Sequence, residues 1–354
     1  MEQVVQDFRA RILAASADRT PLRIVGGGTK DWYGQELRGE TLDTRAYQGI
    51  VAYDPTELVI TARCGTPLAE VEAALAEHRQ MLAFEPPRFG PASTIGGVVA
   101  AGLSGPRRLA VGSARDFVLG VTLMDGRGEL LRFGGQVMKN VAGYDVSRVL
   151  AGSLGTLGLM LDLSIKVLPR PLHETTVRFE MDEAKAIEQL NRWGGQPLPV
   201  SATAWFGGVL IVRLSGAQAA VQSALQKMGG EEEPEAGAFW EELRDHRNAF
   251  LDAQSGGQPL WRVSVAPVAK PLGLPGEQLI EWGGAQRWLR TDAGPQAVRE
   301  AARRADGHAA LFQGDKSAGV FHPLAPAVAA IHQRLKSNFD PAGIFNPGRM
   351  YAEF

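Results

Sequence analysis

Cysteine is almost absent from this 354-residue sequence, which contains only Cys64. A single thiol excludes an internal disulfide framework and any zinc or iron–sulfur site built from cysteines of this chain. No apolar run approaches the roughly 18 residues that a membrane-spanning helix needs. The first 20 residues also lack the apolar segment of a signal peptide. We therefore expect a cytoplasmic chain with no membrane span of its own.

A large excess of charge of either sign is also missing. Lysine and arginine number 37 against 39 aspartate and glutamate, so the formal net charge is -2. This balance excludes the broad basic surface of a nucleic-acid-binding protein. The hydrophobic fraction of 45% is typical of a globular protein. At about 150 residues per domain, the length predicts two domains.

Helices and strands are predicted throughout the first half. Apolar residues at helical spacing predict a helix within residues 1–19. Strands are predicted at 22–25 and 58–63, followed by a helix with Thr66 as N-cap, Pro67 at its first position and Leu68, Val71 and Leu75 on one face.

The remaining pattern predicts a hairpin turning at residues 125–128 and a half-buried strand over 159–167 that stops at Pro169 and Pro171. The acidic stretch 231–235 is interpreted as a solvated loop, and a helix bears Val328, Ile331 and Leu335. We expect an α+β protein with a first domain over residues 1–170, a second over 171–325, and a C-terminal segment, 326–354, that packs back on the first.

The most unusual feature is a run of three glycines, Gly26 to Gly28, followed by Thr29 and Lys30. Consecutive glycines can turn several backbone N–H groups toward one anion and present no Cβ to a ligand. A tight turn between strands explains the same run equally well. The spacing matches neither the dinucleotide-binding G-x-G-x-x-G pattern nor the P-loop pattern.

Two further clusters favour a ligand. Ser93, Thr94, Gly96 and Gly97 form a second small-residue loop, and residues 134–158 form a third glycine-rich stretch. Two such loops could hold the two phosphates of a pyrophosphate, and one extended ligand would account for all three clusters. On this hypothesis, Gly27→Val abolishes ligand retention and leaves a folded chain.

The order of "VGGGTK", "PASTIGG", "GSARDFVLG", "FGGQVMKNVAGYD" and "AGSLGTLGL" resembles the vanillyl-alcohol oxidase, or PCMH-type, flavoprotein family. The resemblance implies a two-lobed FAD-binding domain with a smaller α+β cap domain, and FAD as cofactor. The positions that match this family's FAD site are Gly26, Gly27, Gly28, Thr29, Lys30, Ser93, Thr94, Gly96 and Gly97 around the pyrophosphate, Arg115 and Asp116 near the ribityl and adenine side, Asn140, Tyr144 and Asp145 beside the flavin, and Asn346 and Arg349 at the flavin edge.

Plainer interpretations stay open for some of these residues. Arg115 and Asp116 could form a surface ion pair, which is worth about 0 to 1 kcal/mol. Asn346 and Arg349 could belong to a capped turn. The glycine loops contain no histidine that could carry FAD covalently, so the resemblance implies noncovalent FAD.

Within this family, "KNVAGYD" and "FDPAGIFNPGRM" are similar to E subunits of bacterial glycolate oxidases. That similarity implies an FAD-binding subunit that works with a catalytic FAD subunit and an iron–sulfur subunit, with glycolate as the substrate. Contact with the inner membrane would be peripheral and come through this complex. The alternatives are a self-sufficient 2-hydroxy-acid dehydrogenase and a structural subunit that binds FAD weakly.

The second domain departs from catalytic relatives, which carry a histidine-rich metal motif. Here His308, Asp315 and His322 are present at stretched spacing, so no metal site is expected. Hydroxy-acid oxidation needs a base and a cation for the carboxylate. The candidates are His322 with Arg213 or Arg262, and none of them lies in a recognisable motif.

Overall fold

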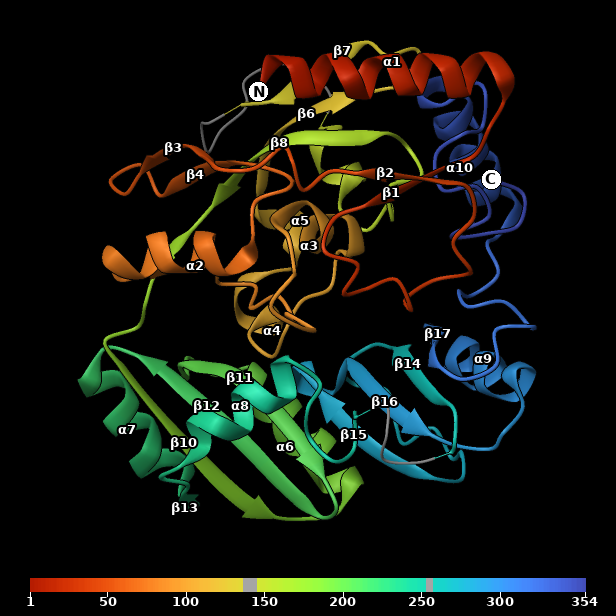
Figure 1. Cartoon of the computed structure of the whole chain (residues 1–354). Coiled ribbons are helices and arrows are strands. Elements are labelled where there is room, and N and C mark those ends of the chain that lie inside the picture. Colours follow the sequence, from red (N-terminus) through yellow and green to blue (C-terminus); the bar gives the residue numbers. More distant parts are fainter. Residues whose placement is uncertain (136–144, 253–256) are drawn as a thin grey trace. The chain divides into compact units, whose positions relative to one another are not determined.

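The computed structural model describes residues 1–135, 145–252 and 257–354, and the chain divides into two compact units (Figure 1). Unit 1 comprises Met1–Leu103, Ser113–Pro169 and Pro323–Phe354, and unit 2 comprises Ser104–Gly112 and Arg170–His322. No sequence pattern indicated that residues 104–112 belong with the second unit. The assignment of the units as FAD-binding and cap domains stays a prediction.

Unit 1 combines helices with three small sheets. Its helices are α1 (Glu2–Asp18), α2 (Leu68–Glu77), α3 (Ile95–Ala101), α5 (Ala114–Phe117), the 3-10 helix η1 (Ser147–Leu150) and α10 (Pro326–Phe339). Its strands are β1 (Leu22–Val25), β2 (Glu40–Asp43), β3 (Ile50–Asp54), β4 (Val59–Arg63), β5 (Gln80–Met81), β6 (Val118–Met124), β7 (Leu130–Gly134), β8 (Leu159–Lys166) and β9 (Leu168–Pro169).

The largest sheet of unit 1 has the strand order β3-β4-β8-β6-β7, and every neighbouring pair is antiparallel. Strands β1 and β2 form a separate parallel pair, and β5 and β9 a short antiparallel one. The predicted hairpin is confirmed as β6 and β7. The C-terminal segment returns to this unit, where Leu22 N–H donates to the carbonyl of Ile344 at 2.7 Å.

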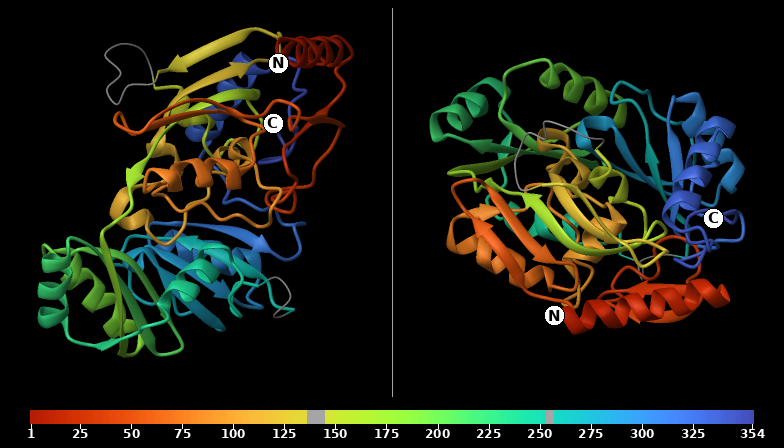
Figure 2. Two further views of the ribbon diagram at one scale, coloured as in Figure 1. Left: turned by 60° about the vertical axis from the view of Figure 1, so that its left-hand side comes forward. Right: turned by 90° about the horizontal axis from the view of Figure 1, so that it is seen from above.

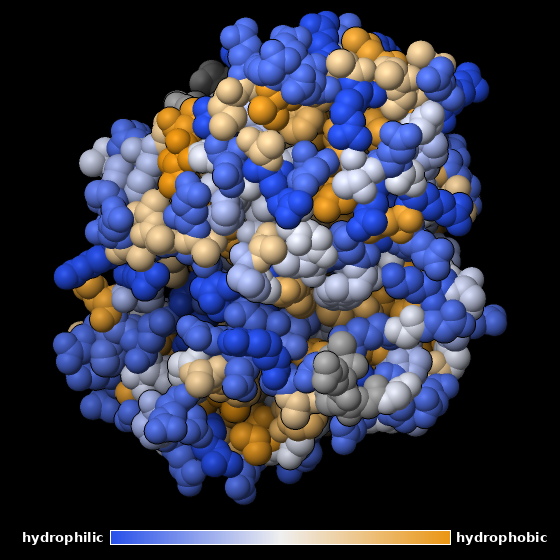
Figure 3. All heavy atoms as spheres, viewed as in Figure 1, coloured by the Kyte–Doolittle hydropathy of each residue, from blue (hydrophilic) through white to orange (hydrophobic). Residues whose placement is uncertain are grey.

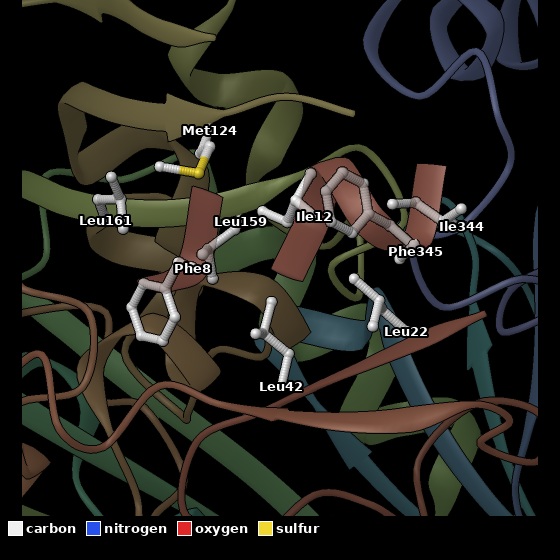
Figure 4. Packing of buried hydrophobic residues seen from close by; sticks show 10 residues of the cluster. Phe8, Ile12, Leu22, Leu42, Met124, Leu159, Leu161, Ile344 and Phe345 are labelled. Atoms are coloured by element: carbon white, nitrogen blue, oxygen red, sulfur yellow. The ribbon is translucent and has the colours of Figure 1, made fainter. Parts of the chain in front are cut away.

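Helix α1 lies along the outside of unit 1 in both views of Figure 2. Phe8 and Ile12 on its inner face are buried, as the helical spacing predicted, whereas Leu13 is exposed. The buried pair packs with residues from β1, β2, β6, β8 and the C-terminal segment (Figure 4), namely Leu22, Leu42, Met124, Leu159, Leu161, Ile344 and Phe345. This core ties both ends of the chain to the sheet.

Two local expectations are corrected. Helix α2 begins at Leu68, with Pro67 as its N-cap, and Thr66 does not cap it. The Thr66 hydroxyl instead bonds to the backbone of Arg63 and Gly49. Strand β8 is buried on both faces except at Asp162 and Lys166, because it is the central strand of its sheet.

Helix α10 was predicted from its apolar residues, but these do not form its buried face. Val328 and Ile331 are exposed, and the buried residue of the helix is Lys336. The stretch interpreted as an acidic loop contains a short exposed strand, β13 (Glu231–Glu232), which pairs with β10.

Unit 2 is built on one antiparallel sheet with the order β13-β10-β12-β11-β15-β16-β14-β17. Its other strands are β10 (His173–Glu180), β11 (Val200–Phe206), β12 (Val209–Gly216), β14 (Leu260–Ser264), β15 (Glu277–Glu281), β16 (Gln286–Arg290) and β17 (His308–Gln313). Its helices are α4 (Arg108–Val111), α6 (Glu183–Gly194), α7 (Gln218–Met228), α8 (Ala236–Arg244), α9 (Pro295–Arg304) and the 3-10 helix η2 (Trp282–Gly284).

Two apolar clusters support this sheet. One packs α6 and α7 against β10 and β12, and the other packs α9 against β14, β16 and β17. The face of the molecule in Figure 3 is mostly hydrophilic, with small apolar patches. Among the described residues, no helix is long and apolar enough to cross a bilayer.

Candidate functional site

Two adjoining cavities in unit 1 bring the predicted loops together. Their volumes are about 510 and 420 Å³. Both cavities are lined by Ile24, Gly26, Gly97, Ala100, Leu154 and Asn346. The larger one extends along Gly27 to Asp31 toward Arg349, and the smaller one along Cys64, Gly96 and Gly155 to Met160. Segments that are distant in the sequence therefore share one elongated depression.

The glycine loop directly follows β1 at the wall of the larger cavity. Gly28 has a φ of +69°, a conformation that side chains disfavour. The backbone N–H groups of Gly26, Gly27, Gly28 and Thr29 have no hydrogen-bond acceptor within the part of the chain that the structure describes. A row of such donors favours an anion.

Close packing between the loops, and not only room for a ligand, requires glycine at these positions. The expectation that Gly27→Val leaves a folded chain is therefore corrected. A Cβ on Gly27 would overlap the carbonyl oxygen of Ala92, and one on Gly26 would overlap the Thr94 hydroxyl. A Cβ on Gly96 would lie 2.6 Å from the Cβ of Cys64. The glycines thus allow the loops to pack on one another, and a valine at position 27 disrupts that packing before it meets any ligand.

Lys30 supplies a positive charge to the larger cavity. Its Nζ donates to the Ser93 hydroxyl at 2.8 Å and to the Thr29 hydroxyl at 3.3 Å, so it joins the two predicted loops. The only acid that lines either cavity among the described residues is Asp31, which forms an ion pair with Arg23. The local charge is therefore suited to an anionic ligand.

Helix α3 forms the opposite wall. Thr94 is its N-cap, and the Thr94 hydroxyl accepts a hydrogen bond from Gly97 N–H at 3.3 Å. Ser93 and Thr94 are both buried. The threonine therefore sets where the helix begins.

Asn346 is buried between three segments of unit 1. Its Oδ1 accepts from Ile24 N–H at 3.0 Å, and its Nδ2 donates to the Leu154 carbonyl at 2.6 Å. A Cβ on Gly155 would lie 2.7 Å from this amide nitrogen, which explains the glycine there. The side chain holds β1, the 151–158 loop and the C-terminal turn in register.

The side chain of Arg349 also forms its hydrogen bonds with the backbone. Its guanidinium donates to the carbonyls of Gln35, Lys30 and Asp31. Burial lowers the pKa of Arg349 to about 10. In this structure the contacts of Asn346 and Arg349 are those of a capped turn, the plainer of the two interpretations of the sequence. Both residues shape the cavity because they fix the loops around it.

Sequence reasoning missed Lys336, which ties the C-terminal turn to the third glycine-rich stretch. Its buried Nζ donates to the carbonyls of Thr156 and Phe345, each at 2.8 Å, and to Asp340 Oδ2 at 2.7 Å. Asp340 also accepts from Ile344 N–H and Phe345 N–H. Burial lowers the pKa of Lys336, and Asp340 opposes that shift. A charged residue among the apolar residues of α10 was the only signal.

Among the predicted residues that the structure describes, Arg115, Asp116 and Asp145 do not line either cavity. Asp116 accepts from both the backbone and the hydroxyl of Ser113, which forms a capping box at α5. Arg115 is exposed, with its Nε 3.9 Å from Asp116. Asp145 is exposed and paired with Arg148 at 2.9 Å. Asn140 and Tyr144 lie outside the described residues.

The potential metal ligands in the histidine-rich stretch of unit 2 do not converge on one point. His322 Nδ1 accepts from Ala309 N–H at 3.3 Å, and Asp315 caps its own turn through Ser317. Arg213 is buried, donates to the Ser201 hydroxyl and lies against Trp240. Within the ranges that the structure describes, no group of three or more histidine, cysteine or acidic residues could hold a metal ion.

Comparisons with known proteins bear on the identity of this site. Residues 3–134 match a family model described as an FAD binding domain. The chain is 49% identical over 349 residues to glycolate oxidase subunit GlcE of Escherichia coli K12, covering 98% of this chain and 97% of that protein. The chain belongs to the GlcE family of glycolate oxidase subunits.

Two further similarities agree with this family. Glycolate oxidase subunit GlcD of Bacillus subtilis is 32% identical over 180 residues, which is 48% of this chain and 37% of that protein. A solved structure of p-cresol methylhydroxylase with substrate bound superimposes with a TM-score of 0.70 at 14% identity, covering 99% of this chain and 88% of that one. The expected α+β fold of the PCMH type and the FAD-dependent oxidoreductase family are thereby confirmed.

Proposed function

We propose that this chain is the FAD-binding subunit of a complex that oxidises glycolate to glyoxylate and passes the electrons to an acceptor. The observation that carries the proposal is the match to GlcE over almost the full length of both chains. Bound FAD supplies the two-electron chemistry by accepting a hydride from a carbon that bears a hydroxyl. The sequence of this chain offers no recognised base, so a second subunit supplies the catalytic residues.

The cavity residues fit a dinucleotide pyrophosphate. The free N–H donors of Gly26 to Thr29 and the ammonium of Lys30 are the groups that bind phosphate oxygens. Ser93, Thr94, Gly96 and Gly97 would form the other wall, and Asn346 and Arg349 would hold these loops in place. Among the described residues that line the two cavities there is no histidine, which supports noncovalent binding.

Arg115, Asp116, Asn140, Tyr144 and Asp145 are the less supported part of the assignment. The side chains of Asp116 and Asp145 have local partners, and neither residue lines a cavity. We assign these five residues only to the surroundings of the cofactor.

The partners follow from the same division of labour. A chain with one buried cysteine cannot hold an iron–sulfur cluster on its own thiols. We infer that electrons leave through a separate iron–sulfur subunit and that glycolate is oxidised at a catalytic FAD subunit. The complex would lie in the cytoplasm and meet the inner membrane only at its periphery.

The first test is the visible absorbance spectrum of the full chain purified alone, before and after anaerobic addition of glycolate. A flavin spectrum that stays oxidised is the expected result. Bleaching by glycolate would overturn the accessory role, because this chain would then oxidise the substrate itself. A chain that stays colourless after FAD is offered would overturn the cofactor role.

A variant tests the cavity directly. Lys30→Met removes the ammonium that faces the larger cavity and should reduce FAD affinity about tenfold or more, since charge-assisted hydrogen bonds contribute about 1.5 to 3 kcal/mol. Lys227→Met, which removes an exposed lysine in α7, is the matched control and should retain FAD. Equal flavin content in the two variants would contradict the pyrophosphate assignment.

A further inference from the structure

Strands β16, β14 and β17 are neighbours in the sheet of unit 2 (Figure 1). Polar residues of all three strands share one face of this sheet. Ser264 in β14 lies opposite Gln286 in β16 and opposite His308 in β17. Residues directly opposite one another project from the same face, as do residues two apart along a strand. Arg262 therefore shares this face with Gln286 and His308.

The guanidinium of Arg262 is held by two neutral neighbours. Its Nε donates to Gln286 Oε1 at 3.0 Å, and its central carbon lies 5.4 Å from the centre of the Trp282 ring. Its two Nη groups have no hydrogen bond or ion pair within the part of the chain that the structure describes. Arg262 is half-buried and His308 is exposed, so both are accessible to solvent.

The charge around this pair is positive. Arg108 lies 4.3 Å from the centre of the Trp282 ring, close to Arg262. Although the residue as a whole is exposed, partial desolvation of its ring by the surrounding protein and the positive charges of Arg262, His322 and Arg108 lower the pKa of His308, and no acid opposes that shift.

Two acids of unit 2 near this face, Glu281 opposite Gln286 and Asp245 beside His246, are already engaged. Glu281 accepts from the indole N–H of Trp288 at 2.7 Å, and Asp245 pairs with Arg244 at 2.8 Å. A half-buried guanidinium that is oriented through Nε, with both Nη groups open, is preorganised for the two oxygens of a carboxylate.

We propose that Arg262 and His308 form a binding site for a small carboxylate, in which the Arg262 Nη groups take the carboxylate oxygens. The His308 imidazole would hydrogen-bond to the group next to that carboxylate, such as the hydroxyl of a 2-hydroxy acid. The site itself stands on the geometry of unit 2. The site does not depend on the function proposed above, which assigns the oxidation of glycolate to a partner subunit; glycolate serves here as one small 2-hydroxy acid among the possible ligands.

The test follows the histidine ring signals of the full chain by NMR while oxalate or glycolate is added at constant ionic strength. Bound carboxylate should shift the His308 ring signal saturably and raise its pKa, since a nearby anion favours the imidazolium. Arg262→Gln should weaken this binding about tenfold or more. Arg304→Gln removes an exposed arginine from α9 of the same unit and should leave binding unchanged.

Three outcomes would overturn the proposal. These are no saturable shift of His308, the same affinity in Arg262→Gln as in the unaltered chain, and an equal response to chloride. If Arg262→Gln does not fold, His308→Gln at an exposed position serves instead, and calorimetry should give a severalfold weaker affinity for oxalate. The flavin spectrum reports separately on the proposed function, so a chain that holds FAD but ignores oxalate refutes this site alone.

Discussion

Replacing Lys336 by methionine tests the link between the C-terminal turn and the cavity. The substitution keeps most of the volume of the side chain and removes the three hydrogen bonds of its Nζ. Asp340, which is 2% exposed, would keep its two backbone donors and lose its only cationic partner among the described residues. Removing one member of a buried ion pair costs about 3 to 5 kcal/mol.

We therefore expect Lys336→Met to lower the free energy of unfolding by about 3 to 5 kcal/mol. The assay is urea unfolding of the full chain followed by fluorescence, in which Trp32 is the tryptophan of unit 1. Arg334→Met in the same helix is the control, because an exposed substitution should change the free energy by at most about 0.5 kcal/mol.

Flavin retention should fall with stability in Lys336→Met, because the released turn carries Asn346 and Arg349. If the free energy of unfolding falls by less than about 1 kcal/mol, the Lys336–Asp340 pair is no stronger than an exposed salt bridge. That result would refute the prediction. Loss of stability with unchanged FAD affinity would show that the turn does not shape the cavity.

Two further predictions concern stability. Burial lowers the pKa of His246, whose ring contacts Trp288 and Phe312, to about 3. As pH falls below about 6.5, the His246 imidazole is protonated in the unfolded chain but stays neutral in the folded one, so the free energy of unfolding should drop by about 2 kcal/mol between pH 7.5 and 5. Unfolding curves of His246→Phe should lack this drop. An equal drop in that variant would refute the burial of a neutral His246. Gly27→Ala should lower the melting temperature more than Gly28→Ala, because only the former overlaps a carbonyl oxygen, and the reverse order in thermal unfolding would contradict the packing.

The elements of this fold could be predicted where their signals are local. The alternation of 159–167, the turn residues at 125–128 and the helical spacing of Phe8 and Ile12 each depend on neighbours in sequence, and the structure contains all three elements. The three glycine clusters also identified the segments that line the cavities. Such patterns follow from the periods of strands and helices.

The rest depended on contacts between distant segments. In α10, the apolar spacing of Val328 and Ile331 pointed to the wrong face, because the buried position is a lysine whose partners lie in another loop and in the C-terminal turn. Residues 104–112 pack with unit 2 although both their neighbours in sequence belong to unit 1. No local pattern encodes either choice.

The glycine loops show why a ligand site and a packing contact can have the same sequence signature. Gly26 and Gly27 cannot carry a side chain because Thr94 and Ala92 pack directly against their Cα atoms. In the described part of the chain, the N–H groups of the same two glycines have no acceptor and can bind an anion. Any substitution at these glycines changes the wall of the cavity and the stability of the unit together. Lys30 differs, because no glycine packing depends on its side chain: its ammonium lines the larger cavity and donates to the hydroxyls of Thr29 and Ser93. The role of the cavity is therefore better tested at the lysine than at the glycines that revealed it.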